Sequence, residues 1–261
     1  MKKLRKAYIA LIMAFLYAPI VLLILYSFND SKSRANWGGF TLRWYKELFS
    51  DAAIMSALGT TLSIGLLAAV FSTLLGTVGA IALYQMKRGP RKALLSIVNL
   101  PMLNSEVVTG VSLMLLYAMV NIQLGYLTLL LSHIAFCVPY VVLSVMPKLR
   151  QLDPNLAEAA QDLGGNKYVV FRKVIFPLSL SGVVSGISMT FMPAVSTFII
   201  SRLLGGGQQA LIGDIIENQF KVVGNWGLGS AMSVVLMVLI LAAMNVMRKY
   251  EDENAGGNVL L

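Results

Sequence analysis

The chain has 261 residues, of which 57% are hydrophobic and only 13% are charged, and its formal net charge is +9. An ordinary soluble domain carries about 25% charged residues, so this composition cannot cover a soluble surface, and it is too apolar for a disordered chain. The single cysteine, Cys137, excludes a disulfide scaffold, and with the single histidine, His133, it leaves too few ligands for a zinc site. These exclusions leave a polytopic membrane protein.

Six apolar stretches are long enough to cross a bilayer, which takes about 20 helical residues. The sequence predicts spans over residues 7–28, 57–86, 93–120, 126–146, 178–203 and 228–247. The first stretch exceeds the roughly 7–15 apolar residues of a signal peptide, and no small-x-small cleavage site follows it. We therefore expect an all-α membrane protein with about six transmembrane helices in one domain, 1–261, with its first span retained as an anchor.

Basic residues in the connecting segments predict the orientation of these spans, because lysine and arginine are enriched in cytoplasmic loops. The N-terminus, the second and fourth connections and the C-terminus together carry 15 of the 21 basic residues, and the opposite side carries 6. We therefore expect both termini to be cytoplasmic. The positive net charge is then a signal of topology, and it does not indicate a nucleic-acid partner, because no basic patch is interleaved with aromatic residues.

Two outer segments are too long for turns. In residues 29–56, Thr41 is a preferred N-cap before apolar residues at helical spacing, which predicts a short helix. Tryptophan and tyrosine favour the membrane interface, so this segment is either an interfacial anchor or a contact with a partner outside the cell. Residues 204–227 predict a second surface helix, whose apolar face is Leu211, Ile212, Ile215, Ile216 and Phe220.

The inner segment 148–177 predicts a compact protrusion. Asp153 and Pro154 form a helix start, so we expect a helix over about 154–163, ended by Gly164. A second short helix, over about 167–176, is expected to run to Pro177. Such a partly apolar protrusion either contacts another protein or folds back on its own bundle.

The same segment resembles the EAA signature of ABC importer permeases. Glu158-Ala159-Ala160 is followed by three residues, Gly164, nine residues and Val174-Ile175-Phe176-Pro177, where the family usually ends in Ile-x-Leu-Pro. The resemblance implies the type I ABC importer permease fold in a bacterial cell membrane. It also implies that the protrusion docks on a cytoplasmic ATPase subunit through Glu158, Ala159, Ala160, Gly164 and Pro177.

Other segments resemble the C-type permease of spermidine/putrescine importers, namely residues 17–20, 26–29, 40–45, 99–110 and 132–140. The fifth expected span departs from this type, because the C-type Ser-x-Asp-Asp stretch is replaced by Phe191–Thr197, which with residues 202–206 and 211–214 is more similar to the B-type permease. The resemblance implies a second permease subunit, ATPase subunits and an extracytoplasmic polyamine-binding protein as partners, and no cofactor on this chain.

Glu106 is the one acidic residue deep inside an apolar stretch, about thirteen residues into the third expected span. Charges in spans are costly and usually face water or protein, so we hypothesise that Glu106 neutralises the ammonium groups of a passing polyamine, with Asn104 and Ser105 nearby. The alternative is a protonated side chain bonded to a neighbouring helix. Ser196 and Thr197 are weaker pathway candidates, because hydroxyls in spans often bond their own backbone.

The sequence contains no G-x-x-x-x-G-K-[ST] motif, so ATP hydrolysis is expected in separate subunits and the chain itself is not expected to be an enzyme. Two alternatives stay open. One is an ABC importer permease for another small solute. The other is a proton-coupled secondary transporter that uses Glu106 as its titrating site.

Overall fold

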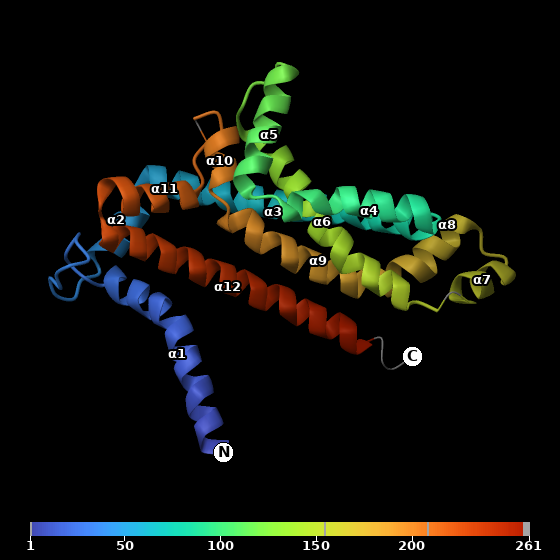
Figure 1. The fold of residues 1–261 in the computed structure, drawn as a ribbon, viewed down its shortest axis with the longest axis horizontal. Coiled ribbons are helices and arrows are strands. Elements are labelled where there is room, and N and C mark those ends of the chain that lie inside the picture. Colours follow the sequence, from blue (N-terminus) through green and yellow to red (C-terminus); the bar gives the residue numbers. More distant parts are fainter. Residues whose placement is uncertain (1, 154, 208, 258–261) are drawn as a thin grey trace. The chain divides into compact units, whose positions relative to one another are not determined.

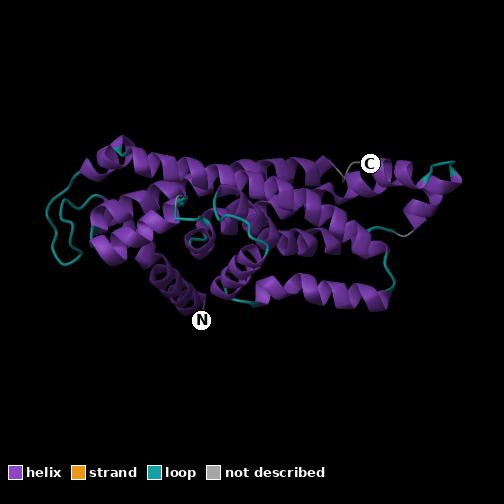
Figure 2. Ribbon diagram, turned by 90° about the horizontal axis from the view of Figure 1, so that it is seen from above, coloured by secondary structure: helices purple, strands orange, loops and turns teal. Residues whose placement is uncertain are grey.

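The computed structural model describes residues 2–153, 155–207 and 209–257, which are helices joined by loops (Figures 1 and 2). Within this part of the chain the only β-pairing is one isolated bridge between Asn29 and Phe40. The all-α prediction is therefore confirmed. The long helices are α1 (Lys2–Ser27), α3 (Ala52–Gln85), α4 (Arg88–Leu103), α5 (Glu106–Met119), α6 (Tyr126–Gln151), α9 (Phe176–Ser196) and α12 (Trp226–Gly257). The short ones are α2 (Arg43–Ser50), α7 (Asn155–Asp162), α8 (Lys167–Val170), α10 (Ile199–Leu204) and α11 (Ile212–Asn218), with π-helical turns at Phe171–Ile175 and Gln219–Val223.

Four helices in the described chain are long and apolar enough to cross a membrane: Arg5–Ser27, Ala52–Gln85, Tyr126–Gln151 and Trp226–Lys249. Two further pairs of helices are long and apolar enough only when both members of a pair are counted together, and each pair is bent at a short break. Arg88–Leu103 and Glu106–Met119 meet at 108°, and Tyr168–Leu180 and Gly182–Ser196 meet at 54°. The expected number of six spans is reached when each pair is one broken or re-entrant span.

The third expected span, 93–120, is wrong as a single regular helix. Its two halves, α4 and α5, are separated by Asn104 and Ser105, whose ψ angles of 153° are extended. Pro101 removes a backbone donor in the last turn of α4, and Ser105 then starts a new helix as its N-cap. Glu106 consequently lies at the beginning of α5 rather than in the middle of a continuous helix.

The fifth expected span, 178–203, is interrupted in the same way. Helix α9 ends at Ser196, Thr197 is extended with ψ 135°, and α10 begins at Ile199. Pro193 lies four residues before the break and leaves one carbonyl of the last turns without its helical donor. A continuous apolar sequence therefore contains a helix end that hydropathy alone does not reveal.

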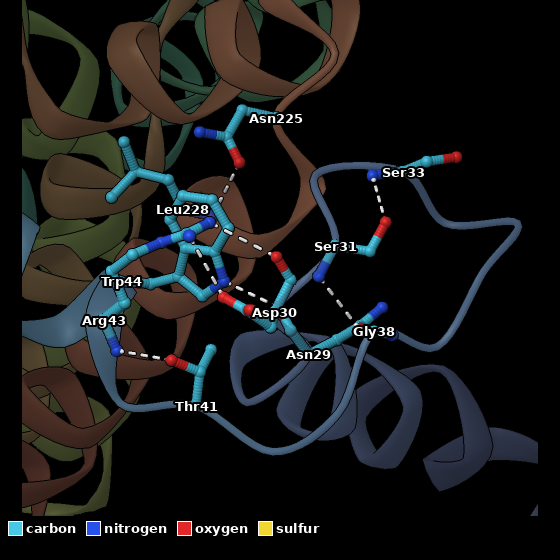
Figure 3. Close-up of polar contacts among 10 residues, drawn as sticks. All are labelled: Asn29, Asp30, Ser31, Ser33, Gly38, Thr41, Arg43, Trp44, Asn225 and Leu228. Carbon is cyan, nitrogen blue, oxygen red and sulfur yellow. Dashed lines mark hydrogen bonds and ion pairs between the residues drawn. The ribbon is translucent and has the colours of Figure 1, made fainter.

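One compact unit of the structure comprises Met1–Gly59 and Leu211–Ile240. The loop after α1 folds around Asn29, whose side-chain oxygen accepts the N–H groups of Gly38 at 2.7 Å and Ser31 at 3.2 Å (Figure 3). The indole N–H of Trp44 donates to the Asn29 carbonyl at 2.7 Å, and Trp44 is 1% exposed. The predicted helix is confirmed as α2, but Trp44 is a core residue of this unit and not an interfacial anchor.

The start of α2 also differs from the prediction. Thr41 is not its N-cap, since Leu42 occupies that position without a side-chain bond. The Thr41 hydroxyl instead accepts the N–H of Arg43 at 3.1 Å, and the Arg43 guanidinium lies 4.3 Å from the Trp44 ring centre and 3.1 Å from the Asp30 carboxylate (Figure 3). These contacts give the loop between α1 and α2 a defined structure.

The second unit comprises Thr60–Ala210 and Leu241–Leu261. Its core lies where α6 packs between α3 and α9, and Val141, Val145 and Leu149 are fully buried there. Glycines permit this approach, because a Cβ on Gly76 would lie 2.6 Å from the Val141 side chain, and one on Gly186 would lie 3.3 Å from it. This tightly packed unit contains both helix breaks described above.

Candidate functional site

Glu106 is placed by the break between α4 and α5. The Ser105 hydroxyl accepts the N–H of Val108 at 3.3 Å, which caps α5 and leaves Glu106 as its first residue. The backbone N–H groups at a helix start favour negative charge, so this position stabilises a carboxylate. Glu106 is half-buried.

Thr197 connects this carboxylate to the other broken helix. Its side chain is 2% exposed, and its hydroxyl donates to the Glu106 carboxylate across 3.0 Å. Glu106 begins one half-helix and Thr197 ends another, so the two breaks meet at one hydrogen bond. The partner is a neutral hydroxyl, which orients the carboxylate without cancelling its charge.

The segment after Thr197 is held by two further contacts. A Cβ on Gly110 would lie 2.8 Å from the Leu203 side chain, so this glycine allows α5 and α10 to pack closely. On the other side, the Thr128 hydroxyl of α6 donates to the Leu204 carbonyl across 3.0 Å. The broken backbone at Thr197 is thus fixed from both α5 and α6.

The remaining expected pathway residues have different roles. Ser105 is the cap of α5, and Asn104 is exposed at the end of α4, where its N–H donates to the Leu100 carbonyl at 3.1 Å. Ser196 is exposed and lines an open groove of about 530 Å³ together with Tyr140, Met189, Met192, Pro193 and Met244. The structure therefore joins Glu106 and Thr197 directly and places Ser196 beside them at the end of α9.

Apart from Ser196, the residues that line the groove were not predicted from the sequence. Tyr140 and Met192 belong to α6 and α9, and their apolar character is the same as that of lipid-facing or core residues. Nothing in their spacing distinguishes them. The cap at Ser105, in contrast, has a sequence signal, since a serine followed by an acidic residue is typical of a helix start.

The predicted protrusion is confirmed in its first half. The Asp153 carboxylate accepts the N–H of Asn155 at 2.9 Å, α7 follows, and Gly164 ends it with φ +85°. Pro154 lies outside the described residues. Glu158 and Ala159 are exposed on α7, and the Ala160 carbonyl accepts the N–H of Gly165 at 3.0 Å.

The second half of the protrusion differs from the prediction, because no helix ends at Pro177. The Asn166 side chain caps α8, the π-helical turn Phe171–Ile175 follows, and the chain continues directly into α9. Pro177 is the second residue of α9, directly after the π-helical turn. The protrusion is therefore continuous with a helix of the second unit.

Apolar side chains are exposed on this protrusion. Leu163 is 90% exposed and Tyr168 is 64% exposed, on either side of the Gly164 turn. A turn that displays two large apolar side chains has the character of a protein-contact surface.

Comparisons with known proteins agree with these features. Residues 72–252 match the family described as "Binding-protein-dependent transport system inner membrane component". The chain is 31% identical to the spermidine/putrescine transport system permease protein PotC of Escherichia coli (strain K12), with 97% of each chain covered. It is 35% identical to the putrescine transport system permease protein PotI of the same organism, with 74% of this chain and 71% of that protein covered.

Solved structures show the same fold. A bacterial ABC transporter involved in the import of alginate has a TM-score of 0.80 at 16% identity, with 97% of this chain and 94% of that chain covered. The inward-facing MetNI methionine ABC transporter has a TM-score of 0.67 at 18% identity, with 78% and 99% covered. Because the family match spans most of the chain, this protein belongs to the inner-membrane permease components of binding-protein-dependent ABC transporters and is a transport subunit rather than an enzyme.

Proposed function

We propose that this chain is a permease subunit of an ATP-driven importer of the polyamines spermidine and putrescine, and that it forms the translocation pathway with a second permease. The observation that carries the proposal is its similarity over nearly its whole length to permeases named for spermidine/putrescine transport. The carboxylate at the meeting point of two broken helices supports the same substrate class.

Glu106 has the chemistry that a polyamine pathway needs. Polyamines carry several ammonium groups separated by methylene chains, and moving them through a membrane requires negative or strongly polar groups along the way. Discontinuous helices are typical of transport sites at membrane depth, because their ends supply unpaired backbone groups. Here Glu106 begins one half-helix, and the carboxyl end of α9, which carries partial negative charge, lies at Thr197.

The protrusion around Gly164 is proposed as the contact with the ATPase subunits. Glu158, Ala159 and Gly164 are exposed, and Leu163 and Tyr168 offer apolar area. Because the π-helical turn joins α8 to α9 without a loop, movement of the docked protrusion would be transmitted to α9 and hence to Thr197. In this proposal the protrusion acts as a mechanical lever between two states of the pathway.

The outer partner is proposed to be a polyamine-binding protein, with both termini of the chain in the cytoplasm. The distribution of basic residues supports this orientation, with 15 of 21 on the proposed inner side. The structured loop around Asn29 then faces outward and exposes Trp37 and Phe40, at 59% and 70%. These side chains are suited to contact a delivered binding protein.

Uptake in cells tests the proposal. Deletion of the gene is expected to abolish uptake of labelled spermidine or putrescine, and the uptake of parent cells is expected to survive a proton uncoupler while ATP is maintained. Loss of the parent's uptake under these conditions would favour the proton-coupled alternative. Unchanged uptake after deletion, with redundant transporters removed, would favour an importer of another solute.

A further inference from the structure

The open groove beside the broken end of α9 has no role in the function proposed so far. We infer that this groove holds the hydrocarbon spacer of the transported amine while Glu106 holds one of its ammonium groups, so that the two together select spacer length. The inference rests on the proposed polyamine function. It assigns a specificity role to Met189, Met192 and Tyr140.

The groove has the character that a methylene chain requires. Its volume is about 530 Å³, and its walls are almost entirely apolar, with Met189, Met192 and Pro193 from α9 and Met244 from α12. Methionine side chains are flexible and polarisable, so they adapt to chains of different length. Met189 and Met192 are 57% and 46% exposed, which leaves them accessible to an incoming solute.

The groove and the carboxylate are joined through two consecutive residues. Ser196 lines the groove, and the next residue, Thr197, donates its hydroxyl to Glu106 at 3.0 Å. Consecutive Cα atoms are about 3.8 Å apart, so the part of the groove wall formed by Ser196 adjoins the residue that binds the carboxylate. An apolar groove whose wall adjoins the residue that binds a carboxylate is complementary to a molecule with an apolar chain and a positive end.

Tyr140 adds a second feature that favours an organic cation. It lines the same groove from α6, and the face of a tyrosine ring attracts ammonium groups. A lipid acyl chain would use the apolar walls but would gain nothing from Glu106, and its headgroup carries a phosphate that the carboxylate would repel. Charge complementarity therefore favours the transported amine as the occupant.

The test uses the complete importer in proteoliposomes, with this permease, its partner permease, the ATPase and the binding protein. Rates of ATP-driven uptake are measured for putrescine and for its one-methylene-longer homologue cadaverine. Each amine is supplied at a concentration that saturates the binding protein, so that differences in rate arise after delivery. The variants are Met192→Ala and Met189→Ala, and the matched control is Met13→Ala, because Met13 in α1 is 46% exposed, the same fraction as Met192.

We expect Met192→Ala to change the ratio of the cadaverine and putrescine rates by about fivefold or more. This threshold lies below the roughly 10–200-fold discrimination that one methylene group gives in a closed pocket, because the groove is open. Met13→Ala should leave the ratio unchanged. Met192→Leu conserves the side-chain volume, so it should give the wild-type ratio. This result would show that the changed ratio of Met192→Ala arises from the lost volume and not from a folding defect.

Two results would overturn the inference while the proposed function stands. One is a wild-type complex that transports both amines, with Met192→Ala and Met189→Ala giving the same ratio as Met13→Ala. The other is a ratio that stays constant in the groove variants while their rates, unlike the rate of Met13→Ala, respond to the acyl-chain length of the vesicle lipids, which would favour a lipid as the occupant of the groove. A wild-type complex that transports neither amine would instead contradict the proposed function.

Discussion

The Thr197 hydroxyl donates to the Glu106 carboxylate across 3.0 Å, and this bond joins the two helix breaks of the second unit. Glu106 and Thr197 are 91 residues apart in the chain. The bond does two things at once. It satisfies a nearly buried hydroxyl at an interrupted helix end, and it fixes the direction in which a negative charge is presented.

Removing this hydroxyl should weaken transport without unfolding the protein. Thr197→Val is nearly isosteric, and hydrogen bonds between membrane helices are worth about 0.6 kcal/mol on average and up to about 1.7 kcal/mol. We therefore expect uptake efficiency, measured as kcat/KM, to fall by roughly threefold to twentyfold at an unchanged amount of assembled complex. Thr197→Ser should recover most of the loss, and a valine variant with wild-type kcat/KM would show that the bond has no positioning role.

The charge of Glu106 should matter more than its hydrogen bond. Glu106→Gln keeps the size and can still accept the Thr197 hydroxyl, but it removes the negative charge that an ammonium group needs. We expect polyamine uptake to fall by at least about tenfold, equivalent to about 1.4 kcal/mol, while co-purification with the partner subunits is unchanged. Normal uptake by an assembled Glu106→Gln complex would assign this residue a purely structural role.

These two residues also show what sequence can and cannot reveal. The apolar run over 93–120 indicates a span, because hydropathy is averaged over many residues and two polar ones, Asn104 and Ser105, change the average little. The helix is interrupted at these two residues, and a single side chain, that of Ser105, caps the next helix. Its local signal, serine followed by glutamate, was present and was outweighed by the length of the run. The pairing of Glu106 with Thr197 has no local signal at all, because it depends on how α5, α6 and α10 pack.

Other elements show the same difference between features with a local sequence signal and features that depend on packing. The helices α2, α7 and α11 were predictable because amphipathic spacing and turn residues are local properties. The burial of Trp44 was not, because a tryptophan in a short helix between spans is equally compatible with the membrane interface until Asn29 and Gly227 are placed beside it. The continuity of the protrusion with α9 was also missed, because a proline in the first turn of a helix was interpreted as the end of the preceding one.

The turn at Gly164 should be required for ATPase binding. Gly164 has φ +85° and open space around it, so Gly164→Ala adds strain of about 1–2 kcal/mol without a clash. We expect less ATPase subunit to co-purify with this variant, and Gly164→Asp and Glu158→Lys to abolish the association. Gly207→Ala is the matched control, because Gly207 has φ +73°, equally open surroundings and a place in the proposed outer loop. Equal ATPase recovery from both alanine variants would contradict the coupling role.

The loop between α1 and α2 should lose its structure when Asn29 is replaced. Its side-chain oxygen accepts two backbone N–H groups and its amide donates to the Asn36 carbonyl at 2.9 Å. Because a hydrogen bond contributes a net stabilisation of about 0.5–1.5 kcal/mol, the loss of these three bonds in Asn29→Ala should lower the thermal stability of the detergent-solubilised protein by several degrees. Asn218→Ala, at an exposed position of α11, should leave it unchanged, and an equal effect of both changes would show that the loop contacts do not stabilise the unit.

The most direct test of the central claim is ATP-dependent accumulation of labelled spermidine by proteoliposomes that contain the purified complex of this chain with its partner permease, ATPase and binding protein. We predict that spermidine accumulates inside the vesicles against its gradient when ATP is enclosed with the ATPase subunit. This accumulation should be unaffected by a proton uncoupler and absent when the ATPase is inactivated. Accumulation driven by an imposed proton gradient without ATP would contradict the account, and so would a complex that hydrolyses ATP in response to its loaded binding protein but moves no polyamine.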